Sequence, residues 1–384
     1  METQFSQRYS YHFPTSIRFG KGVIDELGPY LIEQGLKRPL IVSDPGLVAL
    51  PVFKKVIDEL KKQGLSPEVF SEIDKNPVKS NVLKGAEAFK NHQCDSIVGF
   101  GGGASMDVAR AIALKVNHER DLFDFDDSKG GDRYVTEEIP HFVTVPTTSG
   151  TGSEVGRSTV ISDDVTHEKK ILFSPRLLAK KVFADPELTM DLPPFVTAAT
   201  GMDALTHNIE AYLSKGFSPL CDGIALEGIR LISQSLERAV TKPDLESRAK
   251  MMMASLMGAT AFQKGLGIVH SLAHPLSTVL NMHHGLANAI MLPYGMEFNA
   301  SVSGERMRTI CEAARLPEKS PEAFMEWLKN LNTKIGLPVN LKDLATSDHI
   351  ERLSDLALQD VCHSCNPRAV TRDDFKRIYE KALA

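Results

Sequence analysis

Residues 95–116 read DSIVGFGGGASMDVARAIALKV, and this stretch decides the fold class. Its first part, Asp95–Phe100, is a short apolar run that predicts a buried strand, and Ser105–Val116 has the apolar spacing of a helix. Glycines in the turn between them would let backbone N–H groups approach a pyrophosphate at the helix N-terminus. Glycine-rich turns also occur for structural reasons alone. The stretch therefore predicts a strand–turn–helix unit and leaves its ligand open.

The same alternation continues on both sides of this stretch. Strand-like runs followed by helical patterns occur at Pro39–Ser43 with Val52–Gln63 and at Glu68–Glu72 with Ser80–Asn91. Further strands are predicted at His141–Pro146, at Ser158–Ser162 and Lys170–Phe173 as a hairpin, and at Val182–Pro186. Strands that alternate with helices at this spacing predict a parallel sheet with crossover helices.

The character of the chain changes after Pro193-Pro194. Long segments with helical periodicity dominate from there on, including Leu226–Ala239, Glu246–Gln263 and Pro321–Leu331. At about 150 residues per domain, 384 residues suggest two or three domains. We therefore expect an α/β domain over residues 1–190 and an all-helical domain over residues 191–384.

Composition limits the classes of partner. Lys and Arg number 44 and Asp and Glu 49, so the net charge is −5, which argues against a nucleic-acid binder that relies on a basic face. The five cysteines are an odd number and form no disulfide framework. The charge-free stretch 265–296 contains too many histidines and prolines for a membrane span. Residues 1–13 lack the apolar core of a secretory signal, so we expect a soluble cytoplasmic protein without a membrane partner.

Two further features could belong to a nucleotide site. Residues 147–153, TTSGTGS, follow a predicted strand, and small hydroxyl residues and glycines suit close contact with a polar ligand. A solvated loop is the alternative. Asp44 follows the first predicted strand and could accept hydrogen bonds from an adenosine ribose. Here the acid precedes the glycine loop, which reverses the order of the usual dinucleotide fingerprint.

Histidines gather in the second half, where five of the 12 lie between positions 207 and 284. Asp203 with His207, and His270 with His274, are each spaced i, i+4, so each pair shares one face of a helix. His283 and His284 follow. One carboxylate and several imidazoles in an apolar region suit Zn²⁺, Fe²⁺ or Mn²⁺, although a single buried histidine is more often structural.

The chain resembles the iron-dependent, group III alcohol dehydrogenase family. The motifs that carry the resemblance are GGGASMDVARAIA (101–113), PTTSGTGSE (146–154), ADPELT (184–189), GMDALTHNIEAY (201–212), GIVHSLAHPL (267–276), HHGLANAIMLPY (283–294) and NPR (366–368). They run in order from about Phe13 to the C-terminus at the spacing of the family. The two histidine motifs are highly specific, and the glycine loop is much less so.

The resemblance implies a dehydroquinate synthase-like architecture, in which an N-terminal dinucleotide-binding domain with a parallel sheet and flanking helices precedes an all-α domain. It implies a metal, Fe²⁺ or alternatively Zn²⁺, held by Asp203, His207, His270 and His284. His284 is preferred to His283 because it directly precedes Gly285, and His274 matches a histidine that lies near the metal without binding it. The implied contacts of NAD(H) are Asp44, Asn76, Gly102, Gly103, Thr147, Thr148, Thr151 and Lys169.

These parts predict an NAD-dependent alcohol dehydrogenase or aldehyde reductase that interconverts a primary alcohol or diol and its carbonyl compound. The metal would polarise the substrate oxygen, the nicotinamide would exchange hydride, and His274 would relay the proton as the catalytic residue. The family resemblance implies a homodimer or higher homo-oligomer.

Three kinds of alternative remain. One is a glycerol-dehydrogenase-like or dehydroquinate-synthase-like enzyme of the same architecture. The second is a metal-dependent hydrolase, and the third is a nucleotide-binding protein without catalysis. Cys362-x-x-Cys365 lacks the second pair that a zinc ribbon needs, and it is interpreted as structural.

Overall fold

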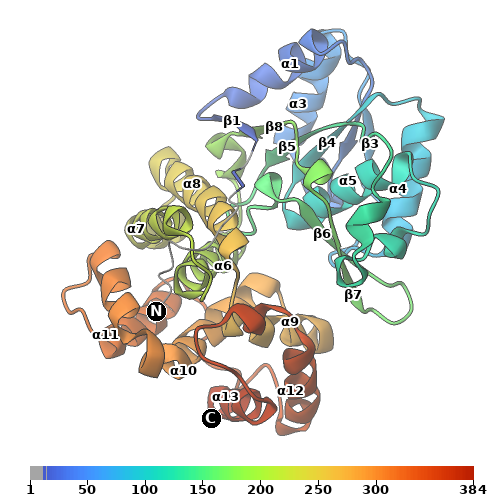
Figure 1. Ribbon diagram of the computed structural model, residues 1–384. Coiled ribbons are helices and arrows are strands. Elements are labelled where there is room, and N and C mark those ends of the chain that lie inside the picture. The colour runs from blue at the N-terminus through green and yellow to red at the C-terminus, as the bar shows by residue number, and fades with distance from the viewer. Residues whose placement is uncertain (1–11, 14) are drawn as a thin grey trace. The chain divides into compact units, whose positions relative to one another are not determined.

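The computed structural model describes residues 12, 13 and 15–384 (Figure 1). Most of the N-terminal stretch in which we found no signal sequence therefore lies outside the described residues. The chain forms two compact units. Of the described residues, one comprises 15–148 and 153–191, and the other comprises 12, 13, 149–152 and 192–384. We call them the α/β unit and the helical unit.

The α/β unit is built on a six-stranded parallel sheet in the order β1-β8-β5-β4-β2-β3. The strands are β1 (Ser16–Phe19), β2 (Pro39–Val42), β3 (Glu68–Phe70), β4 (Ser96–Gly101), β5 (His141–Pro146) and β8 (Lys181–Ala184). The helices are α1 (Leu27–Glu33), α2 (Pro45–Val48), α3 (Pro51–Lys62), α4 (Lys79–Asn91) and α5 (Gly103–Val116). The predicted parallel α/β domain is thus confirmed.

Alternate residues of the strands enter two separate cores. Leu40 and Ile97 pack into one core with α4 and α5, whereas Ile41 and Val98 pack into the other with α1 and α3. Successive side chains of a strand point to opposite faces, so a sheet covered by helices on both faces needs apolar residues at every position. This explains why the strands are continuous apolar runs.

The strand β1 has no counterpart in the sequence-based predictions. Its four residues, Ser16–Phe19, alternate between exposed and half-buried positions and pair in parallel with β8. A short edge strand carries too few apolar residues to stand out in a sequence, because its place depends on the neighbouring strand.

The predicted hairpin is present as β6 (Ser158–Ser162) and β7 (Lys169–Phe173), which pair antiparallel. It is tied to α5 through Asp107, which accepts hydrogen bonds from Ser153 Oγ (2.9 Å) and Val160 N (3.2 Å). The fully buried Arg110, one turn further along α5, lies 3.5 Å from Asp107 and donates to Ser158 O (2.8 Å). A partly buried ion pair therefore holds the hairpin on the helix that follows the glycine loop.

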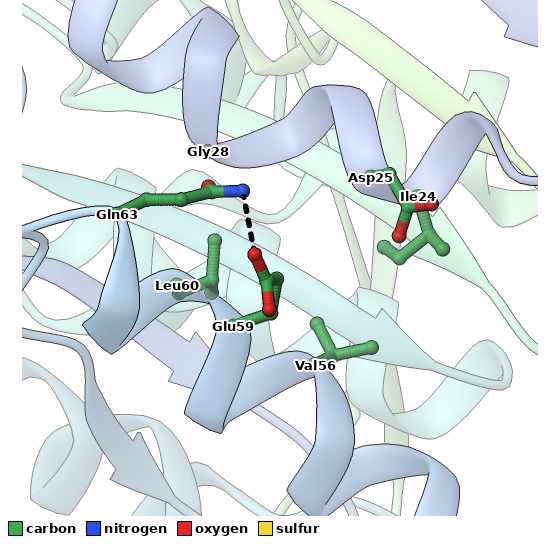
Figure 2. Close-up of a pocket in the computed structure, with 7 residues that line it drawn as sticks. All are labelled: Ile24, Asp25, Gly28, Val56, Glu59, Leu60 and Gln63. Carbon is green, nitrogen blue, oxygen red and sulfur yellow. Dashed lines mark hydrogen bonds between the residues drawn. The ribbon is translucent and has the colours of Figure 1, made fainter.

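A small surface pocket lies on one face of the α/β unit, between α1 and α3 (Figure 2). Gln63 Nε2 donates to Glu59 Oε1 there at 3.4 Å. Its lining residues are Ile24, Asp25, Gly28, Val56, Glu59, Leu60 and Gln63. The pocket has neither a histidine nor a basic side chain, so it offers little to an anionic cofactor.

The helical unit contains α6 (Pro194–Leu213), α7 (Pro219–Thr241), α8 (Leu245–Ala261), α9 (Ile268–Leu280), α10 (His284–Ala313), α11 (Pro321–Lys334), α12 (Ile350–Gln359) and α13 (Arg372–Leu383) (Figure 1). Its core is one large apolar cluster to which all of these helices contribute. Among the described residues, no helix combines the length and the apolar character needed to cross a bilayer.

The helix α6 is buried on nearly every side. Most of its residues are apolar or small, as expected for a helix in the middle of a bundle. It nevertheless carries the buried polar side chains of Asp203, His207, Asn208 and Glu210. Buried ionisable groups need compensating partners, so this helix marks the place to look for a functional site.

The ion pair on α5 gives a first prediction. Asp107→Ala removes the carboxylate nearest to the buried Arg110, and we expect it to lower the free energy of unfolding by roughly 3 kcal/mol in urea denaturation. Glu72→Ala, which breaks an exposed pair with Lys84 in the same unit, should lower the free energy of unfolding far less, because water screens that pair. Equal losses in the two variants would contradict the role given to Asp107.

Candidate active site

Three helices bring the candidate metal ligands together. The helix α6 carries Asp203 and His207 one turn apart, α9 carries His270, and α10 begins at His284. The close approach of α10 to α6 depends on Gly285, because a Cβ there would lie 2.2 Å from the backbone oxygen of Ala199. A residue with a side chain at position 285 would therefore clash with α6.

The donor atoms surround Asp203. The distances from its Oδ1 are 3.4 Å to His284 Nε2, 3.9 Å to His270 Nε2 and 3.9 Å to His207 Nε2. Donor atoms of Asp203, His270 and His284 all lie within 4.8 Å of one another. His207 stacks on His270 with ring centroids 4.7 Å apart.

The electrostatics of this cluster favour a cation. Burial opposes the charged form of Asp203, whereas positive charge beside it, as on protonated His207 or His284, lowers the pKa of its carboxyl. Burial lowers the pKa of His207 and that of His270, so these rings remain neutral and present lone pairs. Among the described residues, the ion-pair partners of Asp203 are all histidines. A buried carboxylate within neutral imidazoles fits a divalent iron ion in its donor types and its charge.

Asn288 is a neighbour of the metal ligands that the sequence analysis missed. Its Nδ2 donates to Asp203 Oδ1 at 2.8 Å and lies 3.1 Å from His284 Nε2. It stands one helical turn after His284 on α10. This i, i+4 spacing could have predicted that the two side chains share a helix face.

Two carboxylates lie within hydrogen-bond distance of the Nδ1 atoms of the two histidines on α9. Glu210 Oε2 lies 2.6 Å from His270 Nδ1, and Asp360 Oδ2 lies 2.7 Å from His274 Nδ1. Both acids were missed. Glu210 lies two turns after Asp203 on α6, and this spacing could have predicted that the two side chains share a helix face. Asp360 follows α12, 86 residues after His274, and no local pattern could have linked the two.

Burial shapes the charge of both acids. It raises the pKa of Glu210 to about 8, and backbone N–H groups of Val269, Gly267 and His270 offset part of this effect. A divalent cation at Asp203 adds nearby positive charge that favours ionised Glu210. For Asp360, burial also opposes ionisation, but His274 and the hydroxyl of Ser271 outweigh it and lower the pKa.

His274 lies beside the metal ligands on α9. Its ring stacks on that of His284 with centroids 5.2 Å apart, and its centroid is 5.8 Å from that of His270. The side chain is 32% exposed, whereas that of His270 is 2% exposed. His283 caps α10, and its ring centroid lies 6.0 Å from that of Phe195.

Four of the predicted cofactor residues, Gly102, Gly103, Thr147 and Thr148, meet at the carboxyl edge of the sheet. Thr147 N donates to Gly101 O (3.0 Å), and a Cβ at Gly102 would touch Thr148 at 3.3 Å. Gly103 opens α5. Gly101 has φ +153°, and a Cβ there would lie 2.4 Å from Ser105 Oγ, so only glycine suits this turn.

Asp44 lies at the same edge, directly after β2. It caps α2 by accepting a hydrogen bond from Leu47 N (3.0 Å), and Ser105 Oγ lies 3.5 Å from its Oδ2. Strand β2 lies between β3 on one side and β4 on the other, so the chain reverses its direction of winding here. Ligands of open α/β sheets bind at this switch point.

The other three predicted cofactor residues come from other segments of the chain. Asn76 precedes Pro77, whose carbonyl accepts from Ser162 N (2.8 Å), and Lys169 pairs with Ser162 in the hairpin. Thr151 belongs to the segment 149–152, which is grouped with the helical unit. Within that unit, Ser255 Oγ donates to Gly150 O at 3.1 Å.

These observations define a class: a two-unit α/β and all-helical protein with a dinucleotide-type turn and a buried His/Asp metal centre. Comparison with known protein families identifies this class. The profile of the family described as iron-containing alcohol dehydrogenase matches residues 14–186, and that of its C-terminal part matches residues 197–383.

Relatives match over almost their whole lengths. The 4-hydroxybutyrate dehydrogenase of Cupriavidus necator is 38% identical, over 97% of this chain and 99% of the relative. The NAD-dependent methanol dehydrogenase of Bacillus methanolicus is 32% identical, over 97% of this chain and 100% of the relative. A crystal structure of 1,3-propanediol oxidoreductase has a TM-score of 0.93 and 34% identity, covering 98% of this chain and 100% of that one.

The chain belongs to the iron-containing alcohol dehydrogenase family. It is an NAD-dependent alcohol dehydrogenase and aldehyde reductase whose metal site contains Asp203, His270 and His284. The predicted family, fold, activity and cofactors, iron and NAD, are thereby confirmed.

The metal site gives the second prediction. His270→Ala should lose bound iron and turnover together, because it removes the most buried of the three imidazoles around Asp203. The loss of metal affinity should exceed the about 10- to 100-fold loss typical of residues that only support a ligand. Metal content by elemental analysis tests this, with the exposed His92→Ala as control. Full iron occupancy in the His270 variant would remove it from the site.

Proposed function

We propose that the chain oxidises a primary alcohol or diol, or reduces the corresponding aldehyde, with four metal ligands, Asp203, His207, His270 and His284, and with His274 as the proton-transferring residue. Residues 1–190 would bind NAD and residues 191–384 would hold the metal. The observation that carries the proposal is the position of His274, which stacks on His284 while its Nδ1 is bound by Asp360.

His207 is proposed as the fourth ligand on the strength of its position. Its Nε2 lies 3.9 Å from Asp203 Oδ1, as does that of His270. Three imidazoles and one carboxylate leave a coordination position for substrate, as a catalytic site requires.

The chemistry divides between the bound groups and the side chains. Iron bound here would act as a Lewis acid on the substrate oxygen. NAD supplies the hydride acceptor or, as NADH, the donor. His274 Nδ1–H donates to Asp360, which leaves Nε2 to take the hydroxyl proton, and the partly exposed ring can pass that proton to solvent.

The NAD site is proposed at the switch point of the sheet. Asp44, Gly102, Gly103, Thr147 and Thr148 meet there, and backbone N–H groups at the start of α5 suit a pyrophosphate. Asn76, Thr151 and Lys169 are proposed as further contacts because of the family resemblance.

The substrate class rests on what the relatives share. Methanol, 1,3-propanediol and 4-hydroxybutyrate, which appear in the relatives' names, each carry a primary hydroxyl group. An absorbance screen for NADH with short primary alcohols, diols and ω-hydroxy acids tests the proposal, and turnover of secondary alcohols only would contradict it.

Assembly and location are proposed on the family resemblance. We infer a homodimer or higher homo-oligomer, which sedimentation analysis tests. A cytoplasmic location agrees with the five cysteines, all of which are free thiols.

The role of His274 gives the third prediction. His274→Ala should retain iron, because His274 is not a ligand in the proposal, yet lose most of its turnover, by about 10²–10⁴-fold. Metal analysis and steady-state kinetics on one preparation test both parts. Loss of iron together with activity would place His274 among the ligands.

Asp44 gives the fourth prediction. A carboxylate at this position accepts from a ribose hydroxyl and repels the 2′-phosphate of NADP, since like charges in partly desolvated contact cost several kcal/mol. We expect NAD(H) to be preferred at least about tenfold in kcat/KM, which needs only roughly 1.4 kcal/mol.

Two variants separate charge from structure. Asp44→Gly should relax the preference mainly by improving NADP(H) use. Asp44→Asn keeps an oxygen that can cap α2 and should relax it as well, because only the charge is lost. Equal use of both cofactors by the native enzyme, or unchanged preference in both variants, would exclude Asp44 from the site.

A further inference from the structure

We propose that Glu210 is a positioning residue of the metal centre: its carboxylate fixes the His270 ring so that Nε2 faces the metal, and this goes beyond its role as a cap of α9. Glu210 lies on α6, two turns after Asp203, and is 2% exposed. It is not itself placed to bind the ion, because His270 lies between.

The first argument is the pair of contacts made by the two carboxylate oxygens. Oε1 accepts a hydrogen bond from Val269 N (2.6 Å), and Oε2 lies 2.6 Å from His270 Nδ1. When Nδ1 carries the hydrogen and donates it to Glu210, Nε2 keeps its lone pair on the side of Asp203. One side chain thus holds both the backbone and the ring of a metal ligand.

The second argument is the space reserved for this carboxylate. A Cβ at Gly267, which caps α9, would lie 2.9 Å from Glu210 Oε1 and 3.0 Å from Asn366 Oδ1. Asn366 accepts from Ile268 N (3.2 Å) and donates to Asn299 Oδ1 (2.8 Å). The start of α9 is therefore held by side chains from α6 and from the 366–368 segment, which fixes the helix that carries His270.

The third argument is the contrast with Asp360, which holds the next histidine on the same helix. Asp360 accepts from His274 Nδ1 (2.7 Å), Ser271 Oγ (2.6 Å) and Cys362 N (2.9 Å). A carboxylate thus holds Nδ1 both in the buried His270 of the metal site and in the partly exposed His274 beside it. If each acid acts through its own histidine, removing their charges must have different effects on metal affinity.

Glu210→Gln is the decisive variant. A glutamine oxygen can still accept from Val269 N, so a residue that only caps α9 would tolerate the change. A positioning carboxylate would not, because the charged acceptor for His270 Nδ1–H is lost. We expect Co²⁺, titrated into metal-free protein and followed by its visible absorption, to bind about 10- to 100-fold more weakly to this variant.

Asp360→Asn is the matched control. It changes the partner of His274 in the same way, and its Co²⁺ affinity should stay within about threefold of the native value, well below the loss typical of a residue that supports a ligand. Circular dichroism and the Tm establish that both metal-free variants are folded. Native Co²⁺ affinity in Glu210→Gln would overturn the proposal, as would an equal loss in Asp360→Asn.

A second variant keeps the test decisive if Glu210→Gln does not fold. Gly267→Ala crowds Glu210 Oε1 without removing its charge, and we expect weaker Co²⁺ binding in this variant too. Unchanged affinity there, with the fold retained, would show that the position of the carboxylate does not matter.

Discussion

The helical unit is organised around the buried carboxylate of Asp203. Asp203 is 2% exposed, and three imidazole Nε2 atoms lie 3.4–3.9 Å from its Oδ1. Such a carboxylate is stable only with compensating positive charge, which neutral rings do not supply but a divalent ion does. The packing excludes water from this carboxylate, because α6 is buried on almost all sides and Gly285 lets α10 come within contact of it. Metal binding and the stability of this core are therefore coupled.

Around that carboxylate, the ring nitrogens have distinct partners. Glu210 holds Nδ1 of His270, and Asp360 holds Nδ1 of His274. His270 and His274, one turn apart on α9, can thus have different roles, because they differ in burial and in the carboxylate that holds them. In the α/β unit, the corresponding constraint is steric. Gly101 and Gly102 keep the space beside Ser105 and Thr148 free of side chains, at the edge where Asp44 caps α2 after the end of β2.

The sequence predicted those elements whose signal is local. The buried strands of the sheet are continuous apolar runs, and the i, i+4 pairs Asp203/His207 and His270/His274 placed their members on common helix faces. It missed β1, whose identity depends on pairing with β8, and Asp360, which lies 86 residues from its histidine. Glu210 was within reach, since it shares a helix face with Asp203. An acidic residue in a helix, however, is usually exposed, and only the fold shows that this one is buried.

The number of imidazoles bound to the metal decides whether the four proposed ligands are right. X-ray absorption at the iron edge of the native enzyme, with analysis of the outer-atom scattering of imidazole, counts histidine ligands. We predict three histidine ligands, His207, His270 and His284, together with oxygen donors that include Asp203. Two histidines would exclude His207 from the site, and four would place His274 on the metal and remove it as the group that moves the proton.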